Sequence, residues 1–450
     1  CSDDPVNVVV RNLDGPTDIA FACIGDLKVT ATDEIIRSAQ PLSSCKTRLD
    51  GEVPPGQEDV SLSPEIFGFV LQQTRGTIAV VDILAGVVAD ADPFAPGRNA
   101  IPIGTLPVGV VEDQSGCFVM TANAGSCDLS ALDVESAVSV TKPAAVTRTA
   151  ITNAAGETLL AKPRAIEPGQ LASDEIGVEC GAAPSGLVYV TFPECNLVAA
   201  IDAGTGQVAA GIRLLEDGTA ELTDGNVTCP TQCGTGALGT VVPTGGVVDA
   251  GVPDAGPVEP PLDLPPGAPV AVELSPDGSR LYVGNQNSPV LTIVDLDTGG
   301  LPTSLQRVVL EGDVGISTID GTETVSMGGA FDSVGEVGVE MRFAYVIATD
   351  GSIRVVDVDG LVECDTQVDP RYLRDTSNIE FLACMAVGDG ATPPRRADAR
   401  GPGIRLPFDA IPLDLEIASV STGESAGQPT PLLLDGTFGF VTSSDGNSFV

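Results

Sequence analysis

A hairpin-sized pattern recurs along this chain and limits the possible fold more than any other feature. The clearest copy, at 274–295, consists of a turn with the residues Pro276-Asp277-Gly278, a strand, a short loop and a second strand that ends at Asp295. Proline presets φ and glycine accepts positive φ, so the first segment has the chemistry of a tight turn. Apolar residues alternate in both following segments, which predicts strands with one buried face.

Less complete copies of this pattern occur elsewhere in the chain. They lie at 67–82, 117–133, 187–202 and 343–357, with a partial copy that begins at 438 and a weak one at 18–30. One such hairpin cannot bury its apolar face alone, so radial stacking of the copies is expected. The 52 Gly and 35 Pro residues agree with many short strands joined by tight turns.

The copy at 274–295 resembles the YVTN, or surface-layer-type, β-propeller repeat, in which S-P-D-G is followed by Y-V-x-N and later by V-x-D. Asn285 lies at the Asn position of that repeat, and Asn123 occupies it in the copy at 117–133. The resemblance implies an all-β fold, a β-propeller of about seven four-stranded blades with long loop insertions. It also implies an extracytoplasmic protein that acts as a binding or scaffold module.

The spacing of the copies predicts the domain organisation. They lie further apart than the roughly 40–45 residues that one blade needs, so the excess should leave the ring as loops. Two insertions are expected, at about 207–268, which contains a Pro/Asp/Ala/Gly-rich run, and at about 361–436. We predict one propeller domain over 16–450. Residues 1–15 would hold a lipidated N-terminus and, at 6–11, a possible closing strand for the last blade.

Cysteine usage indicates an oxidising compartment. The chain has 11 Cys, and Cys1 resembles the acylated N-terminal Cys of a bacterial lipoprotein, so we predict lipidation at Cys1. The others are expected to form disulfides between neighbours in sequence. The predicted pairs are Cys23–Cys45, Cys117–Cys127, Cys180–Cys195, Cys229–Cys233 and Cys364–Cys384. A metal-ligand role for Cys229 and Cys233 lacks the second pair, or the His, that a zinc site would need.

Charge and two absent residue types exclude several functions. With 62 Asp and Glu against 22 Lys and Arg, the net charge is −40. Such a surface repels phosphate backbones, so nucleic acid is not an expected partner. The chain has no His and no Trp. Without His it cannot build a Ser–His–Asp triad, a Cys–His dyad or a His-ligated zinc site, and we expect no catalytic residues.

Some carboxylates are weak candidates for a cation site. Asp90, Asp92, Asp357 and Asp359 could contribute to calcium binding, because hard cations prefer clustered oxygens. None of them follows the twelve-residue loop pattern of an EF-hand. The Asp that ends each strand pair is expected instead to cap a turn by accepting bonds from backbone N–H groups. No cofactor other than calcium is expected.

The only dense basic cluster lies in the second predicted insertion. It consists of Arg395, Arg396, Arg400 and Arg405. One interpretation is a solvated loop. The other is a docking site for the carboxylates of a partner, since arginine binds carboxylates with two hydrogen bonds.

Two classes of function remain open. The first is a lipid-anchored binding or scaffold subunit of an outer-membrane or cell-surface assembly, with the membrane and another protein as partners. The second is a calcium-dependent hydrolase or lactonase-like enzyme that uses the centre of the propeller. Three or more carboxylates converging with an Asn on the ring axis would favour the enzyme. An apolar or plugged axis would favour the scaffold.

Overall fold

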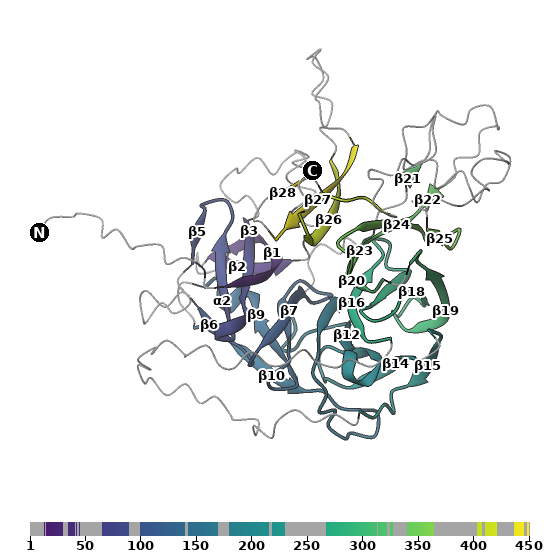
Figure 1. The fold of residues 1–450 in the computed structure, drawn as a ribbon. Coiled ribbons are helices and arrows are strands. Elements are labelled where there is room, and N and C mark those ends of the chain that lie inside the picture. Colours follow the sequence, from purple (N-terminus) through teal and green to yellow (C-terminus); the bar gives the residue numbers. More distant parts are fainter. Residues whose placement is uncertain are drawn as a thin grey trace, which may run out of the picture.

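The computed structural model is nearly all-β, with antiparallel sheets that follow one another along the chain (Figure 1). It describes residues 13, 15–29, 35–40, 42, 45, 65–89, 100–139, 143–169, 180–215, 218–229, 267–312, 314–321, 325–326, 340–363, 403–406, 410–420, 436–444 and 448–449. The helical elements with described bounds are short: α2 (Val134–Ala137), η1 (Gln73–Arg75) and η2 (Pro193–Cys195). No helix in the described ranges is long and apolar enough to cross a bilayer.

Six larger sheets make up most of the described chain. The first contains β1 (Pro16–Val29), β2 (Ile35–Gln40), β3 (Glu65–Gln72), β4 (Thr77–Asp82), β5 (Val87–Val88) and β6 (Ile101–Pro102). The second contains β7 (Pro107–Glu112), β8 (Phe118–Asn123), β9 (Asp128–Asp133) and β10 (Val146–Ala150). The third contains β11 (Ala165–Pro168), β12 (Leu187–Phe192), β13 (Leu197–Asp202), β14 (Val208–Leu214) and β15 (Ala220–Asp224).

The remaining sheets complete the series. The fourth contains β16 (Pro269–Leu274), β17 (Arg280–Asn285), β18 (Val290–Leu296) and β19 (Pro302–Val309). The fifth contains β20 (Ile316–Gly321), β23 (Phe343–Ala348), β24 (Ile353–Asp357) and β25 (Val362–Glu363). The sixth contains β26 (Pro412–Val420), β27 (Gly436–Ser443) and β28 (Ser448–Phe449). A separate two-stranded sheet consists of β21 (Val325–Ser326) and β22 (Glu340–Met341).

One strand of each larger sheet contacts its counterpart in the next sheet. These inner strands are β1, β7, β11, β16, β20 and β26, and each contacts the next along the chain. From β7 onward, the other strands of each larger sheet follow outward in chain order. The sheets therefore lie side by side in a radial series, which agrees with the stacking that the repeats predict (Figure 1).

Apolar side chains fill the space between successive sheets. Tyr282 and Ile293 of the fourth sheet pack with Val346 of the fifth. On its other face, Val283 packs with Ile212 of the third sheet. Each fully buried side chain of this kind contributes about 1.5–3 kcal/mol relative to an exposed one, so stacking on both faces is the main stabilising force.

Three boundaries differ from the sequence prediction. The weak copy at 18–30 is not a separate hairpin, because it lies in β1, which pairs with both β2 and β3 of the first sheet. Strands β14 and β15 occupy the start of the insertion predicted at 207–268, and the inner strand β26 lies within the one predicted at 361–436. The closing strand predicted at 6–11 and the lipidated Cys1 lie outside the described residues.

The disulfides agree with one predicted pair and correct three others. Cys23 bonds to Cys45 as predicted, with a Cα–Cα distance of 5.7 Å. Cys117 bonds to Cys180, and Cys195 to Cys229, at Cα–Cα distances of 5.6 and 5.4 Å. The predicted pairs Cys117–Cys127, Cys180–Cys195 and Cys229–Cys233 are therefore wrong. Cys127 is also disulfide-bonded, and Cys233, Cys364 and Cys384 lie outside the described residues.

Strand length explains why the predicted disulfides Cys117–Cys127 and Cys180–Cys195 are wrong. Cys117 precedes β8 and Cys127 follows it, so this six-residue strand separates them by about 20 Å. The sequence interpretation placed the hairpin turn near Ala122, but Ala122 lies within β8 and pairs with Leu129. In the same way, β12 lies between Cys180 and Cys195.

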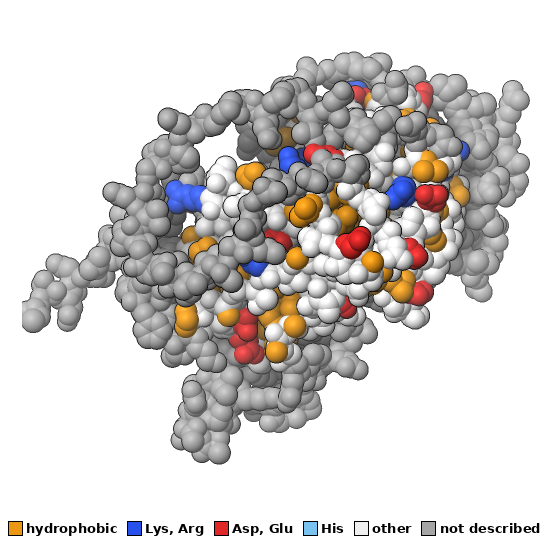
Figure 2. Space-filling view, turned by 90° about the horizontal axis from the view of Figure 1, so that it is seen from below, with side chains coloured by type: hydrophobic (Ala, Val, Ile, Leu, Met, Phe, Trp, Pro, Cys, Tyr) orange, Lys and Arg blue, Asp and Glu red, His pale blue; other side chains and the backbone are white. Residues whose placement is uncertain are grey.

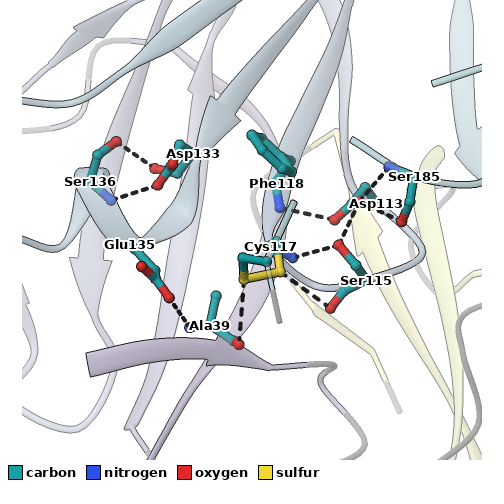
Figure 3. Close-up of a disulfide and its surroundings, with 10 residues drawn as sticks. Ala39, Asp113, Ser115, Cys117, Phe118, Asp133, Glu135, Ser136 and Ser185 are labelled. Carbon is teal, nitrogen blue, oxygen red and sulfur yellow. Dashed lines mark hydrogen bonds between the residues drawn. A yellow bond between two sulfur atoms is a disulfide. The ribbon is translucent and has the colours of Figure 1, made fainter. Parts of the chain in front are cut away.

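The Cys117–Cys180 disulfide lies where the first three sheets meet (Figure 3). Close by, the buried Asp113 accepts hydrogen bonds from the backbone N–H of Phe118 (2.9 Å) and from that of Ser185 (2.9 Å), which precedes β12. On the other side, Glu135 of α2 accepts a bond from the N–H of Ala39 in β2 (3.3 Å). A covalent bond and two carboxylates thus hold these sheets together.

Replacing Cys117 and Cys180 together by Ser should lower the free energy of unfolding by about 2–4 kcal/mol, because the bond closes a 63-residue loop. Denaturant unfolding without reductant measures this change. The matched control replaces Cys23 and Cys45, whose loop of 22 residues predicts a loss about 1 kcal/mol smaller. Non-reducing peptide mapping that joined Cys117 to Cys127 would contradict the pairing.

Candidate functional site

Four successive inner strands carry a carboxyl group at the same register position. In each, the acidic residue lies directly across from an aromatic residue on the neighbouring strand. The pairs are Glu167–Tyr189, Glu273–Tyr282, Asp320–Tyr345 and Glu416–Phe440. We call Glu167, Glu273, Asp320 and Glu416 the carboxylate arc.

The first two inner strands have small or apolar residues at this position. Ala20 of β1 lies across from Phe69, and Val111 of β7 lies across from Met120. Both Ala20 and Val111 are buried. At this one register position the inner strands are therefore acidic in the third to sixth sheets and apolar in the first and second, although β1 also carries Asp18 two residues away.

The members of the arc act on one another electrostatically. Burial, followed by the charges of Asp320, Asp18 and Glu416, raises the pKa of Glu167 to about 8. Burial and the charges of Glu167, Asp320, Glu416 and Asp414 raise the pKa of Glu273 well above its usual value. The charges with the largest effect on these two groups are those of other carboxylates.

Three carboxylates of the inner strands bridge to the next sheet. Asp18 of β1 accepts a hydrogen bond from the N–H of Val110 in β7 (2.8 Å). Glu167 of β11 accepts one from the N–H of Leu274 in β16 (3.2 Å). Asp320 of β20 accepts one from the N–H of Ile417 in β26. These bonds connect the first sheet to the second, the third to the fourth and the fifth to the sixth.

Glu273 differs from its neighbours in the arc. Its side chain is partly buried, and the largest effects on its pKa are burial and repulsion by other carboxylates. Such surroundings make a carboxyl group costly to ionise. Within the described ranges, no group of three or more acidic or Cys side chains is arranged to hold a metal ion. The raised pKa values of Glu167 and Glu273 mean that these two groups hold a proton more readily than a free carboxyl group does.

The two calcium candidates that the structure describes, Asp357 and Asp359, have partners within the chain. Asp357 is buried and accepts bonds from the N–H groups of Asp359 (3.0 Å) and Gly360 (2.8 Å), which makes it a turn cap. Asp359 forms an ion pair with Arg280 (2.6 Å). Asp90 and Asp92 lie outside the described residues. The predicted cap is also present at Asp202, which accepts a bond from the N–H of Thr205 (2.8 Å).

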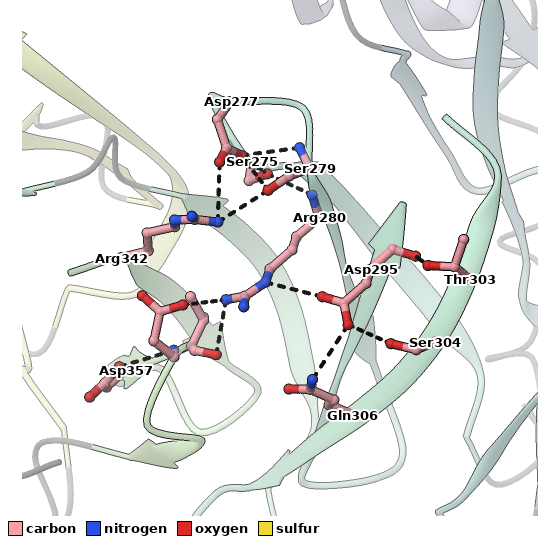
Figure 4. Close-up of polar contacts among 12 residues, drawn as sticks. Ser275, Asp277, Ser279, Arg280, Asp295, Thr303, Ser304, Gln306, Arg342 and Asp357 are labelled. Carbon is pink, nitrogen blue, oxygen red and sulfur yellow. Dashed lines mark hydrogen bonds and ion pairs between the residues drawn. The ribbon is translucent and has the colours of Figure 1, made fainter. Parts of the chain in front are cut away.

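Arg280 belongs to a polar network between the fourth and fifth sheets (Figure 4). Its guanidinium lies between Asp295 (3.2 Å) and Asp359 (2.6 Å). Arg342 reaches back from the fifth sheet to Asp277 of the fourth (3.1 Å). The network connects the outer parts of two sheets and has the character of a structural link.

The predicted basic cluster is only partly described. Arg405 donates to the backbone carbonyl of Asp350 and to its carboxylate, both at 2.9 Å. Arg405 is therefore bound within its own chain, and docking of a partner by this cluster stays a prediction. Arg395, Arg396 and Arg400 lie outside the described residues.

The Asn residues of the repeat are used within their hairpins. Asn285 donates to the carbonyl of Val290 (2.8 Å). Asn123 donates to the carboxylate of Asp128 (2.9 Å) and to the hydroxyl of Ser130 (2.9 Å). Both Asn side chains are buried and fasten the strand turn.

On the face drawn in Figure 2, acidic, basic and hydrophobic side chains of the described residues are interspersed. The carboxylate arc is a group of acidic side chains that share one register position on four inner strands. Sequence reasoning missed it, although each acidic residue precedes or follows an apolar one within an inner strand.

The comparisons with known proteins do not add a function. No protein-family model and no curated protein matches this chain. Among solved structures, it is similar to "Dihydro-heme d1 dehydrogenase NirN in complex with DHE", with 11% identity, a TM-score of 0.36 and coverage of 66% of this chain but only 43% of that chain. It is also similar to the hydrazine synthase of Kuenenia stuttgartiensis, with 13% identity, a TM-score of 0.32 and coverage of 81% and 72%. Likenesses this slight carry no argument.

The usual pKa of a Glu is 4.5, and in the folded protein the pKa of Glu167 is about 8. The free energy of unfolding should fall as the pH rises between these two values. In this window the folded protein keeps a proton that the unfolded chain has lost, so stability decreases with pH. Glu167→Gln should make the decrease smaller, since the amide is neutral and its oxygen can still accept from Leu274. Denaturant unfolding at pH 5 and pH 8 measures this decrease in the free energy of unfolding. The control is Glu221→Gln, which removes an exposed carboxylate of β15. If Glu167→Gln and Glu221→Gln both showed the same decrease between pH 5 and pH 8 as the unaltered protein, the raised pKa would not belong to Glu167.

Asp359→Asn should lower the free energy of unfolding by about 0.5 kcal/mol, because its ion pair with Arg280 is partly exposed. The loss should be the same with and without added calcium. Thermal unfolding in EDTA and in CaCl₂ compares the two conditions. A calcium-dependent stabilisation that disappeared in this variant would restore Asp359 as a ligand.

Proposed function

We propose that the six described sheets are the blades of a closed β-propeller. The contacts between successive inner strands support this arrangement. The ring closure is supported by Asp18 of β1, whose pKa is raised by the protein around its carboxyl group and also by the charge of Asp414 in β26. The first and last inner strands therefore approach each other. The copy at 274–295, with its resemblance to the YVTN repeat, supports the same fold.

We propose further that this propeller is an extracytoplasmic binding or scaffold subunit, held at the outer membrane or cell surface by a lipid on Cys1. The observation that carries the proposal is the Cys117–Cys180 disulfide, which lies at the meeting point of three sheets. A disulfide in such a structural position is typical of an oxidising compartment. The absence of His from the sequence removes the commonest general base, which favours binding over catalysis.

The carboxylate arc favours a second candidate, a calcium-dependent hydrolase. Several carboxylates on the inner strands act on one another electrostatically, although no three acidic side chains of the described residues are grouped to hold a metal ion. The two Asn residues of the repeat, however, are used in their own hairpins. The repeat therefore does not supply the Asn of a lactonase-like ligand set, and we favour the scaffold.

Fractionation and co-purification test the scaffold proposal. The full chain, expressed with its export signal, should be found in the membrane fraction with an acylated Cys1 peptide, and a defined protein should co-purify with it after cross-linking. Cys1→Ser should release it from the membrane and retain the partner. An unmodified Cys1 would contradict the anchor. Calcium-dependent turnover of lactones that was lost in Glu273→Gln would favour the enzyme instead.

A further inference from the structure

The inner strands share a second register position, one residue before the one described above, and its side chains point to the preceding sheet. Val272 clusters there with Ile212 of the third sheet, and Leu415 with Ile347 of the fifth. Five of the six residues at this position are only 4–7% exposed, but Ile19 of β1 is 41% exposed. The six, in chain order, are Ile19, Val110, Ile166, Val272, Ile319 and Leu415. The first sheet therefore lacks the cover that a preceding sheet gives to the other five.

The turn between β4 and β5 of the first sheet is uncovered in the same way. In the first, third and fifth sheets, this turn is capped by an Asp that accepts from the N–H three residues later, namely Asp82, Asp202 and Asp357. The next residue is buried in the third and fifth sheets, as Ala203 and Val358, but in the first it is Ile83, which is 45% exposed. Arg280 of the fourth sheet donates to the carbonyl of Val358 (3.2 Å), so the turn of the fifth sheet lies against the sheet before it. Ile83 therefore lies where a preceding sheet would make contact.

Ile19 and Ile83 form one apolar surface. A Cβ atom at Gly68 would lie 3.0 Å from Cδ1 of Ile19 and 3.1 Å from Cδ1 of Ile83, so the two side chains are neighbours. Leu84, the next residue in the turn, is 84% exposed. The side of the first sheet that points back along the ring is thus apolar and open.

The sixth sheet has an uncovered residue on the side that points onward along the ring. Tyr189 of the third sheet shows the direction of this position, because its hydroxyl donates to the carbonyl of Gly300 in the fourth sheet (2.6 Å). Tyr189 is fully buried, but its counterpart Phe440 of β27 is 41% exposed. Phe440 lies across from Glu416, and both Glu416 and Asp414 are exposed. This side therefore combines an exposed aromatic ring with two exposed carboxylates.

The two uncovered sides belong to neighbouring sheets. The charge of Asp414 in β26 acts on Asp18 of β1, and the sixth sheet lies beside the first (Figure 1). We call the seam the two facing surfaces, with Ile19 and Ile83 on the first sheet and Phe440, Asp414 and Glu416 on the sixth. Contiguous exposed apolar surface with a polar rim is typical of an interaction site.

Charge determines what can cover the seam. A second copy of the chain would bring another net charge of −40 against Asp414 and Glu416, and like charges oppose such an association. A segment with Lys or Arg is complementary to these carboxylates. In an extended strand, successive side chains point to opposite sides. One side of such a strand could contact the apolar first sheet, and the other side the carboxylates of the sixth.

We propose that the seam binds an extended segment of a partner protein in which apolar residues alternate with Lys or Arg. The apolar side chains contact Ile19 and Ile83, and the basic ones bind Asp414 and Glu416. The inference deepens the scaffold function proposed above and rests on the ring of blades and on a protein partner, but not on the lipid anchor.

Peptide binding to the purified full chain tests the chemistry of the seam. A fluorescent peptide of alternating Val and Lys should bind saturably, and binding should weaken as salt is added because the carboxylates are exposed. A Ser–Lys peptide lacks the apolar side and a Val–Glu peptide has the wrong charge, so neither should bind in the same range. Fluorescence anisotropy measures all three. Equal binding of the Ser–Lys peptide would show attraction by net charge alone and would overturn the proposal.

Variants locate the peptide. Ile83→Ser should weaken binding of the Val–Lys peptide by about tenfold, since it removes an apolar contact. Glu416→Gln should weaken it by about threefold, because an exposed ion pair contributes less. The matched controls are Val309→Ser on the exposed side of β19 and Glu221→Gln on β15, and both should bind as the unaltered protein does. Circular dichroism checks that each variant folds, and equal losses in the controls would place the peptide elsewhere and overturn the proposal.

Co-purification separates a failure of this proposal from a failure of the scaffold function. A partner that is retained by Ile83→Ser, while the Val–Lys peptide does not bind, uses another surface; the scaffold function then stands and the seam proposal is wrong. Specific binding of the peptide without any co-purified partner supports the seam and contradicts the scaffold function. Light scattering should show a monomer. A dimer that Ile83→Ser dissociates would assign the seam to a second copy and overturn the proposal.

Discussion

Face-to-face packing places an apolar side chain on both sides of every middle sheet, and the positions of all other groups depend on it. In the fourth sheet, Leu281 and Val283 face the third sheet, and Tyr282 and Ile293 face the fifth. A sheet with two apolar faces is stable only between two neighbours. This requirement brings the inner strands together, and with them the acidic residues that those strands carry.

Bringing the acidic residues together has a free-energy cost, which can be compared with the free energy gained by burying apolar side chains between the sheets. Raising the pKa of Glu167 from 4.5 to about 8 corresponds to about 5 kcal/mol at high pH. Two or three fully buried apolar side chains offset such a cost at about 1.5–3 kcal/mol each. Each sheet interface contains more than that number. The fold therefore tolerates an acidic centre, and its stability is no argument against a functional role for the carboxylates.

The sequence predicted the features that repeat and missed those that do not. The copies at 274–295 and 187–202 correctly indicated the hairpins β17–β18 and β12–β13. The inner strand β26 carries none of the repeat's landmarks, although Leu413, Leu415 and Ile417 alternate with acidic residues. That alternation is a strand signal in its own right. The disulfide errors have another cause: closeness in sequence is a poor guide when a strand of about 20 Å separates two cysteines.

The carboxylate arc could not have been found from spacing, because its members lie on four strands far apart in the chain. Register is what relates them. Glu167, Glu273 and Asp320 each lie across from a Tyr, so the pair recurs with the blade rather than with sequence distance. A purely structural pair would need no acid at this position, since Ala20 and Val111 occupy it in the first two sheets. The fold of a single blade therefore does not require an acid at this position, and two of the four, Glu167 and Asp320, serve instead to accept hydrogen bonds from the next sheet.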